Sequence, residues 1–195
     1  MENITNFLLV GVGGQGILTA SDIAASVGLA AGFEAKKSEI HGFSQRGGVV
    51  ESHVRWGETV GAPTAEEGTV DFLIALEMLE SARWANWLRH GGAVLINQQR
   101  IAPMTVTVGD AVYPADEEIL EVVRARTQDI TLVDALGIAE GLGNSRMTNT
   151  VVLGALSTRL DVDLEIWLSV IEQRVPPKYV ALNRRAFQEG RQAVS

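Results

Sequence analysis

A short apolar run that ends in a cluster of glycines, FLLVGVGGQG at residues 7–16, determines how this chain can begin its fold. An uninterrupted apolar run such as residues 7–10 is typical of a strand buried on both faces, as strands of parallel sheets are. Residues 15–32 then show helical spacing, and the inner face of that helix would consist mostly of small side chains: Ile17, Ala20, Ala24, Val27 and Ala31. The chain is therefore predicted to start with a strand, a glycine loop and a helix that lies close against the sheet.

The glycine loop fits the pattern G-x-G-x-x-G through Gly11, Gly13 and Gly16. Glycines at these positions permit a tight turn and let a phosphate approach the backbone N–H groups at the start of a helix. Three interpretations stay open: a dinucleotide site, a loop whose glycines only allow close packing, or a loop that approaches an anionic group on a partner or its cofactor. A dinucleotide site also needs an acid near the end of the second strand, and Glu34 and Glu39 are the residues available.

The rest of the chain alternates between strand and helix patterns. Further strands are predicted at residues 34–40, 49–56, 71–76, 93–96, 105–108 and 130–133. Further helices are predicted at residues 77–90, 115–126, 135–142, 149–160, 164–174 and 178–194. This alternation predicts an α/β fold with a doubly wound, mainly parallel sheet, helices on both faces and a helical C-terminal third. We expect a single domain over residues 1–195, with an α/β core at 1–145 and a helical part at 146–195.

Several polar and aromatic residues receive a structural interpretation. The strand at residues 49–56 alternates apolar and polar side chains, which predicts one solvent-exposed face with His53 on it. His90 is expected in the last turn of a helix, where a positive charge is favourable. Trp84 and Trp87 have helical spacing, which favours packing over an aromatic ligand pocket. None of these residues is therefore assigned any chemistry.

Composition excludes several classes of function. The 195 residues include 16 Lys and Arg against 24 Asp and Glu, and the resulting charge of −8 argues against nucleic acid as a partner. The chain has no cysteine, which excludes disulfides, a cysteine nucleophile and thiolate ligation of zinc or an iron–sulfur cluster by this chain. No metal site is predicted. We find neither a signal peptide nor the roughly 20 apolar residues that a membrane span needs, so a cytoplasmic protein is expected.

A second loop, SEIHGFSQRGG at residues 38–48, has neither helical nor strand periodicity. It follows the second predicted strand, so it should lie beside the glycine loop at the carboxyl edge of the sheet, where open α/β sheets bind ligands. Arg46 is suited to a carboxylate or a phosphate, because a guanidinium group binds both in a bidentate manner. Two roles stay open for His41: an acid or base, or a surface residue that makes hydrogen bonds.

Three motifs together, GVGGQG at 11–16, SEIHGFSQRGG at 38–48 and ESHVRWG at 51–57, resemble the gamma-type subunit of 2-oxoacid:ferredoxin oxidoreductases. Within that family the second motif is most similar to the beta subunit of indolepyruvate:ferredoxin oxidoreductase. Relatives that act on pyruvate or 2-oxoglutarate more often have a Tyr-Gly-Pro-type stretch where this chain has His-Gly-Phe. The resemblance continues through FLIALEMLE at 72–80 and TNTVVLGAL at 148–156, so it covers nearly the whole chain.

This resemblance implies a subunit that is inactive alone, rather than a complete enzyme. A larger partner subunit would carry thiamine diphosphate, Mg and 4Fe-4S clusters. The complex would decarboxylate an aryl 2-oxoacid such as indolepyruvate, use coenzyme A as co-substrate to form an acyl-CoA, and reduce ferredoxin. The glycine loop of such a subunit should not be a nicotinamide site.

The candidate site residues lie in the two loops and at one position in the C-terminal third. His41 and Arg46 are the candidate catalytic residues. The candidate cofactor-binding residues are Gly11, Gly13, Gly14, Gln15, Gly16, Ser38, Gln45, Arg46, Gly47, Gly48 and Asn149. Asn149 or the preceding Thr148 is also predicted to be a helix N-cap, and the resemblance implies that Asn149 faces the two loops.

Two other classes of function stay open. One is a free-standing Rossmann-type oxidoreductase that binds NAD(P) or FAD, although the sequence offers it only His41 and the two acids Glu34 and Glu39. The other is an interaction scaffold that binds no ligand, in which the two loops would have no chemical role.

Overall fold

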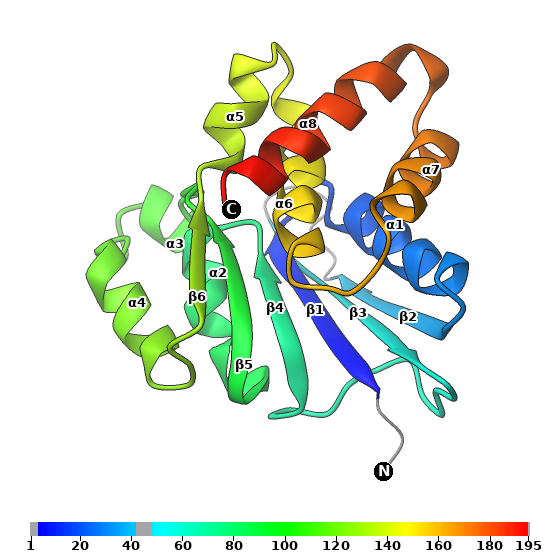
Figure 1. Cartoon of the computed structure of the whole chain (residues 1–195). Coiled ribbons are helices and arrows are strands. Elements are labelled where there is room, and N and C mark those ends of the chain that lie inside the picture. The colour runs from blue at the N-terminus through cyan, green and yellow to red at the C-terminus, as the bar shows by residue number, and fades with distance from the viewer. Residues whose placement is uncertain (1–3, 42–47, 195) are drawn as a thin grey trace.

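Six strands form one mixed sheet in the order β2-β3-β1-β4-β5-β6 in the computed structural model, which describes residues 4–41 and 48–194 (Figure 1). The strands are β1 (Thr5–Val12), β2 (Glu34–His41), β3 (Val49–Gly57), β4 (Val70–Ala75), β5 (Leu88–Asn97) and β6 (Ile130–Val133). Strands β1, β4, β5 and β6 are parallel, whereas β3 runs antiparallel to both of its neighbours, β1 and β2. The mainly parallel sheet is therefore confirmed.

Helices cover both faces of this sheet, as the sequence predicts (Figure 1). One face carries α1 (Ile17–Ala30), α6 (Thr148–Ser157), α7 (Leu164–Arg174) and α8 (Val180–Gln192), and the other carries α2 (Met78–Arg83) and α4 (Asp116–Arg124). The shorter elements are η1 (Ala85–Trp87), α3 (Met104–Thr107), α5 (Ala135–Gly141), η2 (Ser145–Met147) and η3 (Pro177–Tyr179). Over the described ranges, none of these helices has the length and hydrophobicity needed to cross a bilayer.

Strand β1 is buried on both faces and divides the core into two parts. Phe7 and Leu9 pack with α1, α6, α7 and α8, while Leu8 and Val10 pack with α2 and α4. The uninterrupted apolar run follows directly from this position, because neither face of the strand meets water.

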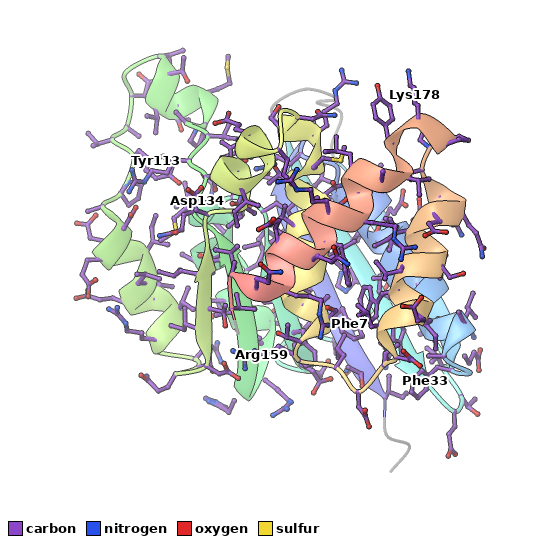
Figure 2. The ribbon with its side chains drawn as sticks, turned by 45° about the horizontal axis from the view of Figure 1, so that its top comes forward. Phe7, Phe33, Tyr113, Asp134, Arg159 and Lys178 are labelled. Atoms are coloured by element: carbon purple, nitrogen blue, oxygen red, sulfur yellow. The ribbon has the colours of Figure 1, made fainter. Side chains whose placement is uncertain are left out.

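Helices α6 and α8 cross in direct backbone contact on the first of these faces. A Cβ atom added to Gly154 in α6 would lie 2.1 Å from the carbonyl oxygen of Phe187, and one added to Gly190 in α8 would lie 2.0 Å from that of Val151. All residues of α6 are buried. The contact therefore holds the C-terminal helix tightly over α6, as Figure 2 shows from the carboxyl edge of the sheet.

Two elements predicted from the sequence are wrong. The helix predicted at residues 77–90 ends at Arg83, and β5 begins already at Leu88, so His90 lies in a strand and not in the last turn of a helix. A register shift makes this possible, because Leu88 pairs with Val70 but Ala93 pairs with Phe72. The strand predicted at residues 105–108 is the helix α3. Its β-branched residues cannot form a strand beside β5, since β4 and β6 already flank β5.

The predicted solvent-exposed face of β3 is also wrong. Glu51 and His53 are buried, and the His53 side chain is fully enclosed. The indole ring of Trp87 lies against the imidazole, with 5.1 Å between the ring centroids. The alternation of polar and apolar residues in β3 indicates solvent exposure of one face. It cannot show that Trp87, from a distant part of the chain, covers that face. The predicted packing role of Trp87 is confirmed.

Candidate functional site

The glycine loop at residues 11–16 joins β1 to α1 at the carboxyl edge of the sheet. Gly16 is the N-cap of α1 with a φ of 80°, and Gly14 has a φ of 106°, both in the left-handed region that favours glycine. A Cβ atom at Gly11 would lie 2.6 Å from Oε1 of Gln15. The loop thus needs glycine for its turns and its close contacts. The N–H groups of the first turn of α1, which have no acceptor within the helix, begin at this loop.

The side chain of Gln15 is engaged by the chain itself. Its Oε1 accepts a hydrogen bond from the backbone N–H of Val12 at 2.8 Å. Its Nε2 donates to the carbonyl oxygen of Leu76 at 2.7 Å and to Oε1 of Gln99 at 2.8 Å. These bonds tie the glycine loop to the ends of β4 and β5, so Gln15 shapes the loop from within.

Asn149 lies against the glycine loop, although it follows Gly16 by 133 positions. Its Nδ2 donates to the carbonyl oxygen of Gly16 at 3.2 Å, and its Oδ1 accepts from the backbone N–H of Thr150 at 2.9 Å. A Cβ atom on Gly16 would lie 2.7 Å from this Nδ2. The structure therefore brings together Asn149 and the glycine loop.

The predicted N-cap role of Asn149 or Thr148 is wrong. The 3-10 turn η2 runs directly into α6, so Met147 occupies the N-cap position without a capping side chain. Thr148 already lies inside the helix and donates its hydroxyl to the carbonyl oxygen of Ser145 at 2.7 Å. The cap sits one turn earlier, where Oδ1 of Asn144 accepts from the backbone N–H of Arg146 at 3.1 Å.

The second loop meets the glycine loop where β3 begins. The carbonyl oxygen of Gly48 accepts a hydrogen bond from the N–H of Gly13 at 2.9 Å. In the sheet, Val49 pairs with Val12 at the end of β1, and Val50 pairs with His41 at the end of β2. The two loops are therefore neighbours at one edge, as the sequence predicts.

The remaining candidates of the second loop divide into two groups. Gln45, Arg46 and Gly47 lie outside the described residues. Ser38 lies within β2, where its carbonyl oxygen accepts from Oγ of Ser52 at 3.3 Å. Ser38 pairs with His53, on the face away from α1, and it does not line the pocket described next.

An open pocket of about 970 Å³ lies beside the glycine loop, between α1, α5, α6 and α8. This volume is at the upper end of the roughly 300–1,000 Å³ of small-molecule sites. The polar side chains on its walls are Gln15, Thr19, Gln99, Glu140, Asn144, Ser145, Arg146, Thr148, Asn149, Thr150, Tyr179 and Asn183. In Figure 2, Asp134 marks the start of α5. Lys178 lies just before the start of α8, on the other side of the view. The pocket combines residues from both halves of the chain.

Arg146 is the basic side chain of the pocket wall. It is exposed, and among the described residues its guanidinium group has no recorded hydrogen bond or ion pair. Glu140 is the acid on the same wall. With the first turn of α1, this free guanidinium makes the pocket suitable for an anionic group. Arg146 could not be identified from the sequence, because its stretch, NSRMTN at residues 144–149, indicates only the start of a helix.

The geometry does not match a dinucleotide site. In a Rossmann fold the second strand is adjacent to the first, whereas here β3 separates β2 from β1. The two acids considered for the ribose are also engaged. Glu39 forms an ion pair with Lys37, and Glu34 accepts from the backbone N–H of Val60 at 3.0 Å. Neither acid lines the pocket.

The described residues offer no set of donor groups for a metal ion. The described ranges contain no group of three or more His, Asp or Glu side chains placed to hold a metal ion. The full sequence has no cysteine to ligate an iron–sulfur cluster.

Comparisons with known proteins show which family this chain belongs to. Residues 6–193 match the family described as pyruvate ferredoxin/flavodoxin oxidoreductase. The chain is 41% identical over 193 residues to indolepyruvate oxidoreductase subunit IorB of Archaeoglobus fulgidus, covering 97% of this chain and 96% of that protein.

Solved structures show the same fold. The keto/oxoacid ferredoxin oxidoreductase gamma subunit of Geobacter sulfurreducens superposes with a TM-score of 0.71 at 26% identity, covering 97% of this chain and 98% of that one. A 2-oxoglutarate:ferredoxin oxidoreductase of Magnetococcus marinus superposes with a TM-score of 0.76 at 19% identity, and the match covers 98% of this chain but 31% of that longer chain. The chain therefore belongs to the pyruvate ferredoxin/flavodoxin oxidoreductase family.

Proposed function

We propose that this chain is the small, cluster-free subunit of an indolepyruvate-type 2-oxoacid:ferredoxin oxidoreductase. The observation that carries the proposal is its 41% identity, over nearly the full length of both chains, to an indolepyruvate oxidoreductase subunit. The complex would convert an aryl 2-oxoacid, coenzyme A and oxidised ferredoxin into an acyl-CoA, carbon dioxide and reduced ferredoxin.

A larger catalytic subunit is the expected partner. Thiamine diphosphate with Mg would supply the decarboxylation chemistry there, and 4Fe-4S clusters would carry electrons to ferredoxin. The absence of cysteine from this chain supports that division of labour, because a cluster needs thiolate ligands from elsewhere. The match to about a third of a longer oxidoreductase chain is in keeping with a fold that works beside further domains.

The role of this chain would be to bind an anionic group at the carboxyl edge of the sheet. The first turn of α1 offers N–H groups, Arg146 offers a guanidinium, and Gln15 and Asn149 hold the loop in shape. A carboxylate of the 2-oxoacid and a phosphate of coenzyme A both have the required chemistry. Arg46 would add a second guanidinium from the neighbouring loop, and His41 stays the candidate acid or base.

The chain would act as one domain in this complex, and we expect the complex in the cytoplasm. One continuous hydrophobic cluster supports the single domain, because it includes Phe7 and Leu9 of the sheet together with Trp167 and Phe187 of the C-terminal helices. The helical part at residues 146–195 would then not fold apart from the α/β core.

The test is the activity of this chain co-expressed with its larger subunit. We expect reduction of ferredoxin that depends on indolepyruvate and coenzyme A, with phenylpyruvate as a weaker substrate and with pyruvate and 2-oxoglutarate nearly inactive. The isolated chain should show no turnover. A complex that prefers pyruvate or 2-oxoglutarate would contradict the aryl specificity, and turnover by the isolated chain would contradict the subunit role.

A pair of arginine variants tests the pocket. Arg146→Gln removes the free guanidinium of the pocket wall, whereas Arg185→Gln removes an exposed one in α8 outside the pocket. We expect Arg146→Gln to raise the KM for coenzyme A or for the 2-oxoacid about tenfold, since a charge-assisted hydrogen bond contributes about 1.5–3 kcal/mol. Arg185→Gln should leave both KM values unchanged. Equal KM values in the two variants would exclude the pocket as the anion site.

The competing dinucleotide function is tested by titration of the isolated chain with NAD, NADP and FAD. The separation of β1 from β2 by β3 leads us to expect no stoichiometric binding. A micromolar complex with any of the three would favour the free-standing oxidoreductase instead.

A further inference from the structure

A buried polar network joins the ends of three strands beneath the glycine loop. Asn97, at the end of β5, is fully buried. Its Nδ2 donates to the carbonyl oxygen of Leu76 at 2.9 Å, and its Oδ1 accepts from the backbone N–H of Ala135 at 3.1 Å, where β6 passes into α5. Asn97 thus fixes the end of β4 relative to the start of α5, a helix that borders the pocket.

Gln99 extends this network to the glycine loop. Its carbonyl oxygen accepts from the backbone N–H of Met78 at 2.9 Å, which holds the residue in place after β5. Its side-chain Oε1 accepts from Nε2 of Gln15 at 2.8 Å. The carbonyl oxygen of Leu76 accepts from the same Nε2 at 2.7 Å. Two acceptors therefore hold the amide nitrogen of Gln15 toward the ends of β4 and β5.

The orientation of the Gln15 amide contributes to the shape of the loop, beside the backbone bond from the N–H of Gln15 to the carbonyl oxygen of Val12 at 3.2 Å. With Nε2 held by Gln99 and Leu76, Oε1 points to the backbone N–H of Val12, from which it accepts at 2.8 Å. That bond closes the turn between the end of β1 and Gln15. A loop held in this way presents the first turn of α1 to the pocket without first having to become ordered.

We infer that Gln99 is a positioning residue, which orients Gln15 and so preorganises the glycine loop for its anionic ligand. The inference rests on the proposed function of the pocket. Gln99 itself acts through Gln15. Its loss should therefore weaken ligand binding rather than the chemical step, and it should have no effect once Gln15 is gone.

The experiment compares Gln99→Met, Gln15→Met and the double variant, each in the complete complex with the larger subunit. Gln98→Met is the matched control, because Gln98 is exposed, adjacent, and makes no recorded side-chain hydrogen bond over the described ranges. Leu120→Ala is a second control, since Leu120 is a core residue of α4 far from the pocket. A loss of stability alone would change the KM values of Leu120→Ala as well, whereas an effect on the glycine loop would change only those of Gln99→Met and Gln15→Met.

We expect Gln99→Met to raise the KM for coenzyme A or for indolepyruvate about fivefold, as the loss of one hydrogen bond predicts, with little change in kcat. The KM that rises identifies the ligand of the pocket. In the Gln15→Met background, Gln99→Met should add nothing, because the two side chains act as one unit. Both controls should keep the KM values of the wild type. Unchanged KM values in Gln99→Met, or effects that add independently in the double variant, would overturn the inference.

Amide hydrogen exchange of the full chain gives a test that needs no activity. The N–H of Val12 should exchange about fivefold faster in Gln99→Met, because it is protected by Oε1 of Gln15. The N–H of Leu76, which donates to the carbonyl oxygen of Val10 at 2.9 Å, should be unaffected. Equal exchange of Val12 in the wild type and the variant would contradict the inference even if the complex proved to have another substrate. An inactive complex with faster exchange of Val12 would contradict only the proposed function.

Discussion

The imidazole ring of His53 and the indole ring of Trp87 lie with their centroids 5.1 Å apart, at an interplanar angle of 59°. His53 is completely buried, and neither of its ring nitrogens has a hydrogen-bond partner in the part of the chain that the structure describes. Burial lowers the pKa of the imidazole below its usual range, and the nearby Arg55 adds to this effect. The folded state therefore favours the uncharged imidazole of His53, and protonation of this ring opposes folding.

This arrangement predicts that His53→Leu stabilises the chain, and more so in acid. Replacing an unpartnered imidazole by an apolar side chain should raise the free energy of unfolding by about 1 kcal/mol at pH 8. Because the pKa is lower in the folded state, the wild type loses stability as the pH falls below the ordinary histidine value of about 6.5. The leucine variant has no such loss, so its advantage should grow between pH 7 and 5.

The measurement is the melting temperature of both proteins across that pH range. His90→Leu serves as the control, because His90 is exposed in β5. The melting temperature of the control should change with pH as that of the wild type does. A difference in melting temperature between His53→Leu and the wild type that stays constant from pH 8 to pH 5 would contradict the explanation.

Glu51, two residues before His53 in β3, predicts the opposite pH dependence. Burial raises the pKa of its carboxyl group, so the folded state favours the protonated form. Stability from this group is present below the unfolded pKa of about 4.3 and is lost as the pH rises through the raised folded value. The side chain introduced by Glu51→Gln cannot ionise. The free energy of unfolding of this variant should therefore exceed that of the wild type by up to about 1 kcal/mol at pH 7 but by little at pH 4. Urea unfolding at both pH values tests this, with the exposed Glu58→Gln expected to show no gain.

The contact between α6 and α8 predicts contrasting effects for two glycine substitutions. Gly154→Ala would place a Cβ atom 2.1 Å from the carbonyl oxygen of Phe187, whereas a Cβ atom at Gly141 in α5 meets nothing within 4 Å. We expect Gly154→Ala to lower the free energy of unfolding by about 2–3 kcal/mol. Gly141→Ala should raise it by about 0.5–1 kcal/mol through its helical preference. Thermal unfolding of the two variants compares them directly, and similar shifts would show that the helices do not cross at the glycines.

Arg46 gives a prediction about function. The sequence predicts that Arg46 lies in a surface loop, so we expect Arg46→Ala to change the free energy of unfolding by less than about 0.5 kcal/mol. Activity of the assembled complex should nevertheless fall about tenfold or more, and Arg46→Lys should recover only part of it if the contact is bidentate. If Arg46 instead only fixes its own loop, the alanine variant would melt earlier, and activity would fall in proportion to the folded protein that remains. Melting temperature and specific activity should be measured on the same preparations.

Local patterns in the sequence were sufficient for most elements of the fold. The apolar run around Leu8 and Val10 identified a strand buried on both faces, and the glycine loop identified the start of α1. The errors occurred where distant segments decide the outcome. The alternation around His53 indicated a solvent-exposed face, but Trp87 covers it. The β-branched residues near Thr107 indicated a strand, but the sheet has no free place beside β5.

The candidate site divides in the same way. The two loops could be placed together because they follow strands that end at one edge, and the bond from Gly13 to Gly48 bears this out. The opposite wall of the pocket could not be predicted by spacing. Arg146 and Gln99 reach the pocket only through the packing of α5, α6 and β5, and neither belongs to a pattern that indicates binding.

The crossing of α6 and α8 has a consequence for the order in which this protein can become functional. One wall of the pocket follows β1 at the beginning of the chain, while Tyr179 and Asn183 on the facing wall belong to its last helical segments. During synthesis, the glycine loop therefore leaves the ribosome long before the helix that completes its binding site. The complete pocket should therefore form only once these last segments have left the ribosome and α8 has docked on α6.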